Sequence, residues 1–461
     1  MPIEREQQSV SCSLSNLTGG MNASVPENMI AENEAALLEN YMFEQGVLRT
    51  RDGYSEPLVD VGEPIDKIWY DLSTDGFLIA GKPAEDGSEG ANVYYAYVGE
   101  QPTSLGRLTG RERPMCCRFS DKIIIASGGK LQYYDYRNPL VTVESSFLSD
   151  NLWVQDMRLG TSKRGDDNFR YSSTGDCTSA EAWKEDTNMI SQAQWYQIGA
   201  CDGGDIITVL TLAGDLIVFK TNYRGYRVSG TVPDLSSDAV LSDTHAEDDR
   251  EAFALMGGTI VFATDLGLRS LQTTTTYGNF DTAEVAYKIN RLLQESCHKP
   301  KVWNMLTRRQ LWIRPSEADK KTFYIYQYDT GAAYKYVFHD DINDAVETSN
   351  GIMLATDAGL RRMSFEYTKD GNALIKSKIV SKMFITPNRI ITRYLDMFVE
   401  GREGDDDSKI HVQIANRGFD YSLASKRRIK HFYNSLRAFE IVVTSSSPHR
   451  IKNFNLYGVD E

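Results

Sequence analysis

The side chains that most often carry catalysis are scattered along this chain. None of its six histidines stands in an HxH or HExxH spacing that holds zinc, and no G-x-S-x-G elbow, P-loop or dinucleotide fingerprint occurs. Clustered aspartates offer oxygen ligands for a hard cation, but they lack EF-hand spacing and are interpreted as solvated loops. These clusters are Asp248-Asp249, Asp340-Asp341 and Asp405–Asp407. The sequence therefore predicts no catalytic residue, no cofactor and no metal site, and a protein that is not an enzyme.

Cysteine chemistry is also weakly indicated. The six cysteines show no CxxC spacing and are expected to be buried or free thiols in a reducing compartment. Cys297-His298 is interpreted as a packed thiol beside a surface imidazole, and Cys116-Cys117 as two strand residues that face opposite ways. The glycine-rich CDGGDI that begins at Cys201 is interpreted as a turn, because its aspartates would repel an anion.

The densest positive stretch is SKRRIKHF at 425–432, with Lys426, Arg427, Arg428 and Lys430. Its simplest interpretation is the polar face of a strand or short helix. A sharper hypothesis is a contact with an acidic surface of a neighbouring subunit, where charge complementarity sets the docking register. The net charge of −14 argues against a protein that grips nucleic acid, because such binding needs clustered Lys and Arg.

Short apolar strands bounded by Gly, Asp and Asn dominate the chain after residue 45. IVFATDLGLRSL at 260–271 and IMLATDAGLRRM at 352–363 share Ala-Thr-Asp-x-Gly-Leu-Arg, and their alanines are 92 positions apart, or two units of 46. The unit matches the roughly 40–50 residues of a four-stranded propeller blade. A similar strand recurs near Ala80, Ala126, Tyr171, Lys220, Ala263, Arg314 and Ala355.

The repeat predicts an all-β fold, a β-propeller in which seven blades are favoured and six are possible. The recurring strand is expected to be the inner strand of each blade, followed by a glycine turn and a second strand. Because each small sheet buries a face on its neighbour, the array must close on itself. A strand within residues 47–54 is expected to complete the last blade near residues 352–380. The alternative is that such runs recur by chance in an all-β protein.

Three regions follow from this pattern: an extended N-terminal arm at 1–45, the propeller at 46–380 and a C-terminal β unit at 381–461. The last is expected to be sandwich-like, because its strands alternate over longer stretches than the repeat allows. The N-terminus carries charges where a secretory signal needs apolar residues, and no run approaches the ~18 apolar residues of a membrane span. A soluble protein made in the cytoplasm is therefore expected.

GGMNASVPENMIAENEAALLENYMFEQGVLRTRDGY at 19–54 resembles the opening of the β-propeller tail hub and nozzle proteins of short-tailed bacteriophages. FRYSSTGDCTSAEAW at 169–183 and GGDIITVLTLAGDLIVFKTNYRGYRVSG at 203–230 look like two further segments of that family. The matching positions in the arm include Gly19, Gly20, Asn22, Pro26, Asn33, Glu34, Ala35, Leu38, Glu39 and Asn40. The arm and seam residues expected to close the ring are Gly46, Leu48, Arg49, Arg51, Gly53 and Tyr54.

The resemblance implies a virion tail protein, made in the host cytoplasm, that forms a ring of six copies below the portal and adaptor. Such a ring would extend the channel, retain the packaged genome and guide its ejection. Its expected partners are further copies, the portal, the adaptor and other tail proteins, with passing double-stranded DNA and no membrane insertion. The acidic charge would let DNA slide. The alternatives are a propeller enzyme that acts on a glycan through two carboxyl groups from several blades, and a host receptor-binding protein.

Overall fold

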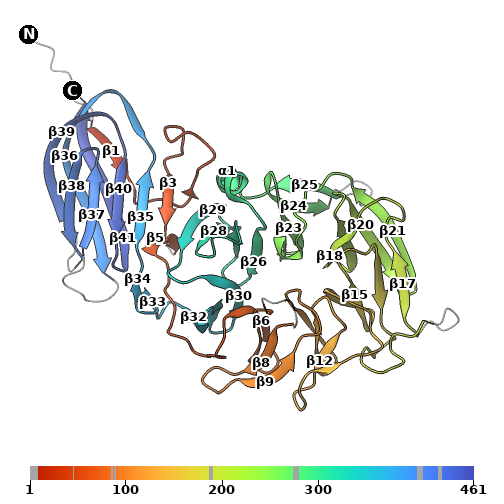
Figure 1. The fold of residues 1–461 in the computed structure, drawn as a ribbon. Coiled ribbons are helices and arrows are strands. Elements are labelled where there is room, and N and C mark those ends of the chain that lie inside the picture. Colours follow the sequence, from red (N-terminus) through yellow and green to blue (C-terminus); the bar gives the residue numbers. More distant parts are fainter. Residues whose placement is uncertain are drawn as a thin grey trace, which may run out of the picture.

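The structure is a computed structural model that describes residues 9–44, 46–84, 87, 90–185, 191–273, 280–401, 409–423 and 428–460. Strands make up most of the described chain, beside one helix, α1 (Tyr287–Ser296), and a 3-10 turn, η1 (Arg250–Ala252). Figure 1 shows a ring of small sheets at the right and a stack of C-terminal and N-terminal strands at the left. None of the described helices has the length and apolar character needed to cross a bilayer.

Small antiparallel sheets follow one another around an axis, so the chain is an all-β protein with a β-propeller, as predicted (Figure 1). Within the described residues, five units are separate four-stranded sheets, and the sixth unit is the first four strands of a ten-stranded sheet. A three-stranded sheet lies between the sixth unit and the first. The four-stranded units are β6 (Ile65–Asp71), β7 (Gly76–Gly81), β8 (Asn92–Ala96), β9 (Thr103–Arg107); β10 (Met115–Phe119), β11 (Lys122–Ala126), β12 (Gln132–Tyr134), β13 (Val141–Thr142); β14 (Asn151–Gln155), β15 (Arg158–Ser162), β16 (Asn168–Tyr171), β17 (Gln194–Gln197); β18 (Ile206–Leu212), β19 (Asp215–Lys220), β20 (Gly225–Thr231), β21 (Asp234–Leu241); β22 (Phe253–Met256), β23 (Thr259–Thr264), β24 (Gly267–Thr273), β25 (Phe280–Glu284); and β26 (Lys301–Met305), β27 (Gln310–Arg314), β28 (Thr322–Gln327), β29 (Ala332–Val337). The three-stranded sheet is β30 (Ile342–Thr348), β31 (Gly351–Thr356) and β32 (Gly359–Met363).

The first strand of each unit lies nearest the axis. Side chains from six of these strands line one central cavity of about 320 Å³. They include Trp69, Met115, Leu210, Phe253, Val302 and Val346. The expectation that the recurring apolar strand is innermost was therefore wrong.

The recurring strand is instead the second strand of each unit. It is buried on both faces because it is packed between neighbouring sheets, which is why it reads as a continuous apolar run, as in GFLIAG of β7 and GIMLAT of β31. Tyr171 is the exception, since it lies on the third strand, β16. The second strand of that unit is β15, which is fully buried although its sequence, RLGTS, is largely polar.

The near-identical Ala-Thr-Asp-x-Gly segments are tight turns between second and third strands. The hydroxyl of Thr264 donates to the carbonyl of Gly267 at 2.7 Å, and that of Thr356 donates to Gly359 at 2.8 Å. Gly267 and Gly359 have φ values of +107° and +128°, which favour glycine. The repeated Ala-Thr-Asp-x-Gly sequence therefore specifies the conformation of this turn.

The ring closes between the three-stranded sheet and the first unit. Asn343 Nδ2 donates to the carbonyl of Ile65 at 2.7 Å, and the backbone N–H of Ile68 donates to Asp344 Oδ2 at 3.0 Å. Residues 54–59 run beside β32, where Tyr54 pairs with Met363.

The strand that was expected to complete the last blade lies elsewhere. β5 (Val47–Thr50) pairs with β4 (Tyr41–Glu44) and with the C-terminal strand β41 (His449–Asp460). Leu48 is fully buried opposite Ile451, so its apolar side chain serves the C-terminal core.

N-terminal and C-terminal strands share two sheets. One sheet has the order β39-β36-β41-β5-β4, with β1 on β41; the other continues from β29 through β2-β3-β35-β40-β37-β38. Their buried side chains form one cluster, so the arm and the C-terminal unit share a core. The further strands are β1 (Ser9–Ser13), β2 (Gly20–Met21), β3 (Glu34–Glu39), β33 (Lys369–Asp370), β34 (Ala373–Leu374), β35 (Ser377–Ser381), β36 (Phe384–Gly401), β37 (Lys409–Ile414), β38 (Arg417–Ser422), β39 (Arg428–Phe439) and β40 (Ile441–Ser445).

Candidate functional site at the arm junction

A single guanidinium lies where the arm, the sixth propeller unit and β33 meet. The Arg51 side chain is fully buried, and its five N–H donors have five acceptors. Nε donates to Asn40 Oδ1 at 2.8 Å, and the two terminal nitrogens hold both oxygens of Asp370 at 2.8 and 2.6 Å. The remaining donors bond the carbonyls of Asp52 and Val337. Such a bidentate, fully satisfied pair fixes orientation as well as distance.

Asn40 gives this junction its shape. Its φ of 59° places it in the left-handed region, which asparagine tolerates better than most residues. Its Oδ1 also accepts the backbone N–H of Val337 at 2.8 Å, and its Nδ2 donates to the carbonyl of Lys376 at 2.7 Å. One side chain therefore ties the arm to β29 and to the segment before β35.

Gly53 and Tyr54 lead the chain from this junction into the propeller. A Cβ at Gly53 would lie 2.0 Å from the carbonyl oxygen of Lys369, so glycine is required there. Tyr54 is buried, and its hydroxyl donates to Asp340 Oδ2 at 2.9 Å. Burial, followed by the charges of Asp370 and Asp340, raises the pKa of Tyr54 above its usual range.

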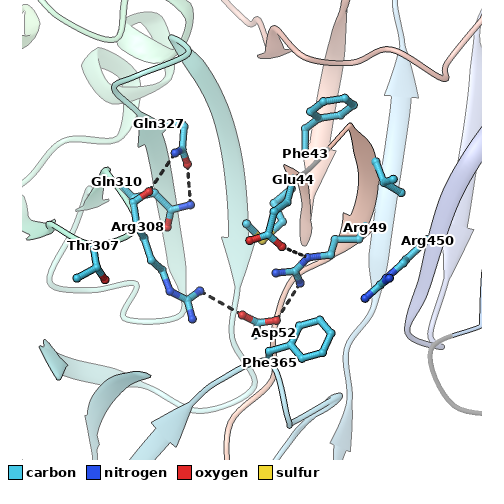
Figure 2. Close-up of a pocket in the computed structure, with 12 residues that line it drawn as sticks. Phe43, Glu44, Arg49, Asp52, Thr307, Arg308, Gln310, Gln327, Phe365 and Arg450 are labelled. Atoms are coloured by element: carbon cyan, nitrogen blue, oxygen red, sulfur yellow. Dashed lines mark hydrogen bonds and ion pairs between the residues drawn. The ribbon is translucent and has the colours of Figure 1, made fainter. Parts of the chain in front are cut away.

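Figure 2 shows a pocket of about 560 Å³ beside the junction, between the β4–β5 hairpin and the sixth unit. Arg49 donates to Glu44 at 2.6 Å and to Asp52 at 2.8 Å, while Arg308 reaches Asp52 from the opposite wall at 3.2 Å. Burial would lower the pKa of Arg49, but Asp52 and Glu44 raise it. Asp52 is therefore the bridge between two cationic walls.

A buried histidine joins the arm to the C-terminal strand. His449 Nε2 lies 2.7 Å from the Tyr41 hydroxyl, and Nδ1 lies 2.7 Å from the carbonyl oxygen of Ser447. The ring is fully buried, and burial lowers the pKa of His449 to about 4. The imidazole is therefore neutral at pH 7.

A second charged cluster lies at the propeller hub. Glu251 binds Arg113, Lys67 at 3.0 Å and Lys301 at 2.9 Å, so one carboxylate joins three units. Burial would raise the pKa of Glu251, but the charges of these three cations lower it well below its usual range. Each cation also has a second carboxylate: Asp66 for Arg113, Asp344 for Lys67 and Glu317 for Lys301.

The hub also contains a buried carboxyl group, Asp150. Asp150 lines a cavity of about 200 Å³ with Glu112 and Arg250, and burial raises the pKa of Asp150. Its carboxylate accepts the backbone N–H of Arg164 at 3.0 Å. Within the described residues, no group of three or more His, Cys, Asp or Glu side chains is arranged to hold a metal ion.

The structure brings the predicted arm residues together and leaves the basic stretch apart. Leu48, Arg49, Arg51, Gly53 and Tyr54 lie at the junction, and Gly46, with a φ of +78°, lies in the turn after β4. Lys426 and Arg427 lie outside the described residues. Arg428 begins β39, and Lys430 is exposed on the same strand, which is separated from β5 by β36 and β41 in their sheet.

The other motifs have structural roles. Asp202 of CDGGDI binds the buried Lys220 at 2.7 Å and accepts a hydrogen bond from the Tyr226 hydroxyl. Burial raises the pKa of Asp202, but these hydrogen bonds outweigh it and lower the pKa to about 2. Cys116 and Cys117 pack against different clusters, as expected for neighbours on a strand.

The predicted acidic loops were only partly solvated. Asp249 caps η1 by accepting the backbone N–H of Glu251 at 2.9 Å, and Asp340 binds Tyr54. Asp405–Asp407 lie outside the described residues.

Sequence reasoning missed the partners of the arm. Asp370 sits in TKDG and Arg308 in TRRQ, both of which look like ordinary polar turns, and the same is true of the hub residue Glu251 in DDREAF. Arg49 and Arg51 could have indicated these partners, because a buried arginine needs a carboxylate elsewhere in the chain.

No protein-family model matches this chain, and no curated protein matches it. Solved structures with likeness to it include the extracellular domain of a hybrid two-component system from B. thetaiotaomicron, at 10% identity over 90% of this chain, with a TM-score of 0.46. This chain spans 61% of the length of that domain. The Cps50 (Swd1) β-propeller domain from Myceliophteria thermophila has 10% identity, a TM-score of 0.40 and 68% and 98% of the two chains covered. Such distant likenesses carry no argument about function.

Proposed function

We propose that this protein is a structural subunit of a short-tailed bacteriophage tail. Six copies form a ring that extends the DNA channel below the portal and adaptor, retains the packaged genome and guides its ejection. The observation that carries the proposal is the role of the segment that resembles the tail hub and nozzle family. Its residues Asn40, Arg51 and Gly53 make structural contacts that join the arm to β29 of the propeller and to β33. A part that must keep its shape under pressure needs such contacts.

The proposed channel runs between copies rather than through each propeller. The hub is crossed by the ion pairs of Glu251, and its cavity of about 320 Å³ is lined by apolar side chains such as Trp69 and by charged ones such as Lys67. A DNA duplex does not fit there. The lumen therefore has to be a surface shared by the subunits.

The proposal includes two finer points of architecture. The three-stranded sheet β30–β32 acts as a seventh blade whose outer edge is completed by residues 54–59, which bond Arg362 and Leu360 of β32. The C-terminal strands and the arm strands act together as a sandwich-like unit over one core.

The test is the native mass of the full chain, alone and with the portal and adaptor of the virus that encodes it. We expect an assembly at six times the 51.9 kDa of the single chain and a ring with a central hole in electron micrographs. We also expect weak duplex binding at physiological salt, because the chain carries a net charge of −14. A monomer in every mixture would overturn the proposal.

An enzyme acting on glycans is a second candidate because of Asp150. A buried acid of raised pKa beside Glu112 is the kind of pair that glycosidases use. Release of reducing sugar from bacterial surface glycans, abolished by Asp150→Asn, would favour this candidate over the tail subunit. We expect no release.

A further inference from the structure

We propose that neighbouring copies join through two strand edges at opposite ends of the molecule, with β39 of one copy pairing with β21 of the next. The inference rests on the proposed ring and names the surfaces that build it. In Figure 1, β39 lies at the left end with the C-terminal strands, and β21 lies at the right end beside β20 and β17.

The β39 edge is long, open and basic. Among the described strands it pairs only with β36, at the end of its sheet. Its sequence RIKHFYNSLRAF carries two arginines, a lysine and no acid. Ile429 is 53% exposed and Tyr433 is 73% exposed, so the edge also presents apolar surface.

The β21 edge is open and acidic. It is the outermost strand of the fourth unit, and its sequence DLSSDAVL carries two aspartates and no base. Residues 236–239 are all exposed, so both faces of the strand meet solvent. Arg227, which lies opposite Asp238 on β20, is ion-paired with Asp215 at 2.6 Å.

Charged side chains on a strand edge often serve to prevent aggregation. That role explains neither the exposed Ile429 and Tyr433 nor the division of sign between the two edges. Two β39 edges would repel each other, as would two β21 edges, whereas β39 and β21 attract. The charges therefore select a head-to-tail contact between different edges.

The β39 edge and the β21 edge lie at opposite ends of each copy (Figure 1). A head-to-tail contact repeated by rotation gives a ring when the rotation closes. The shorter strand, β21, has eight residues, so the ladder would extend over about 27 Å. Backbone hydrogen bonds between the two strands would supply the affinity, and the charged side chains would determine which edge is bound.

The test is charge reversal on the full chain, measured by sedimentation. We expect Asp234→Lys with Asp238→Lys, and separately Lys430→Glu with Arg437→Glu, each to weaken self-association about tenfold or more. The four changes in one chain should restore assembly, because both edges are then reversed. Glu100→Lys with Asp121→Lys, at exposed turns of other units, is the matched control and should leave assembly unchanged.

A second readout is zero-length carbodiimide coupling of the assembled protein, followed by peptide mass spectrometry. We expect a covalent link between Lys430 of one copy and Asp234 or Asp238 of another. A ring that survives both reversals without this link would overturn the strand pairing and leave the proposed function standing. A chain that stays monomeric in every mixture would overturn both.

Discussion

The arm junction and the propeller hub both bury charge between distant segments, but they distribute it differently. At the junction, Arg51 has one carboxylate partner, Asp370, which is 319 positions away in the chain. At the hub, Glu251 has three cations, and each of those cations has another carboxylate. The junction depends on one pair, whereas the hub shares its charge among several.

The difference shows where the molecule is vulnerable. Removing one partner from a buried pair leaves an unpaired charge, which is far more damaging than the pair itself is stabilising. At the hub, the loss of Glu251 leaves its partners with other ions of opposite charge, whereas at the junction the loss of one charged side chain leaves Asp370 or Arg51 without one. Substitutions at the two sites should therefore differ in their effect on stability.

The largest effect is expected from Arg51→Met. The change leaves Asp370 buried without its cation, and it should lower the free energy of unfolding by about 3–5 kcal/mol in urea denaturation. Arg51→Met with Asp370→Leu should be less destabilised than the sum of the two single changes. Additive losses would show that the two side chains are not coupled.

Gly53→Ala should lower the free energy of unfolding by about 3 kcal/mol, because the added Cβ meets the Lys369 carbonyl at 2.0 Å and the backbone has to move. Gly418→Ala is the matched control, since its Cβ would meet only the ring of His411, a side chain that can turn away. Equal thermal midpoints for the two variants would contradict the close approach at the junction.

Glu251→Gln should lower the free energy of unfolding by about 2 kcal/mol, less than Arg51→Met, because Arg113, Lys67 and Lys301 keep their second carboxylates. Urea denaturation of both variants at one pH gives the comparison. A loss larger than that of Arg51→Met would mean that the hub depends on a single group as well.

The smallest effect is a pH dependence at the junction. The pKa of His449 is about 4 in the folded protein and about 6.5 when unfolded, so the unfolded chain binds more protons between these values. Its contribution to stability is present above pH 6.5 and is lost as the pH falls toward 4. Lowering the pH from 7 to 5.5 should remove about 1 kcal/mol through this residue. His449→Gln should show that much less pH dependence in urea denaturation.

The propeller could be predicted from the sequence because most of its second strands are buried on both faces and therefore consist of consecutive apolar residues. The third unit was misplaced because β15 is buried yet reads RLGTS, with polar atoms that are satisfied locally: the buried Arg158 donates to the carbonyl of Ser172 at 2.8 Å. Burial of polar residues leaves no periodic signal.

The junction was only half predictable. The arm residues could be identified by resemblance, but their destination could not, because β5 pairs with a strand some four hundred positions later. The local sequence indicates that a segment forms a strand, but it does not indicate which other strand it pairs with. Residues 54–59 make the bonds that were expected from 47–54, a shift of a few residues that the alternating pattern does not resolve.

The pairing of β1 with β41 has a consequence for the order of events during synthesis. Ser9 lies opposite Val459, so the earliest described strand has no partner until nearly the whole chain has been made. At about 5–20 residues per second, translation keeps it waiting for roughly 20 to 90 seconds. The propeller can form in that interval. Strand β1 is therefore made early and is among the last of the described strands to reach its final place.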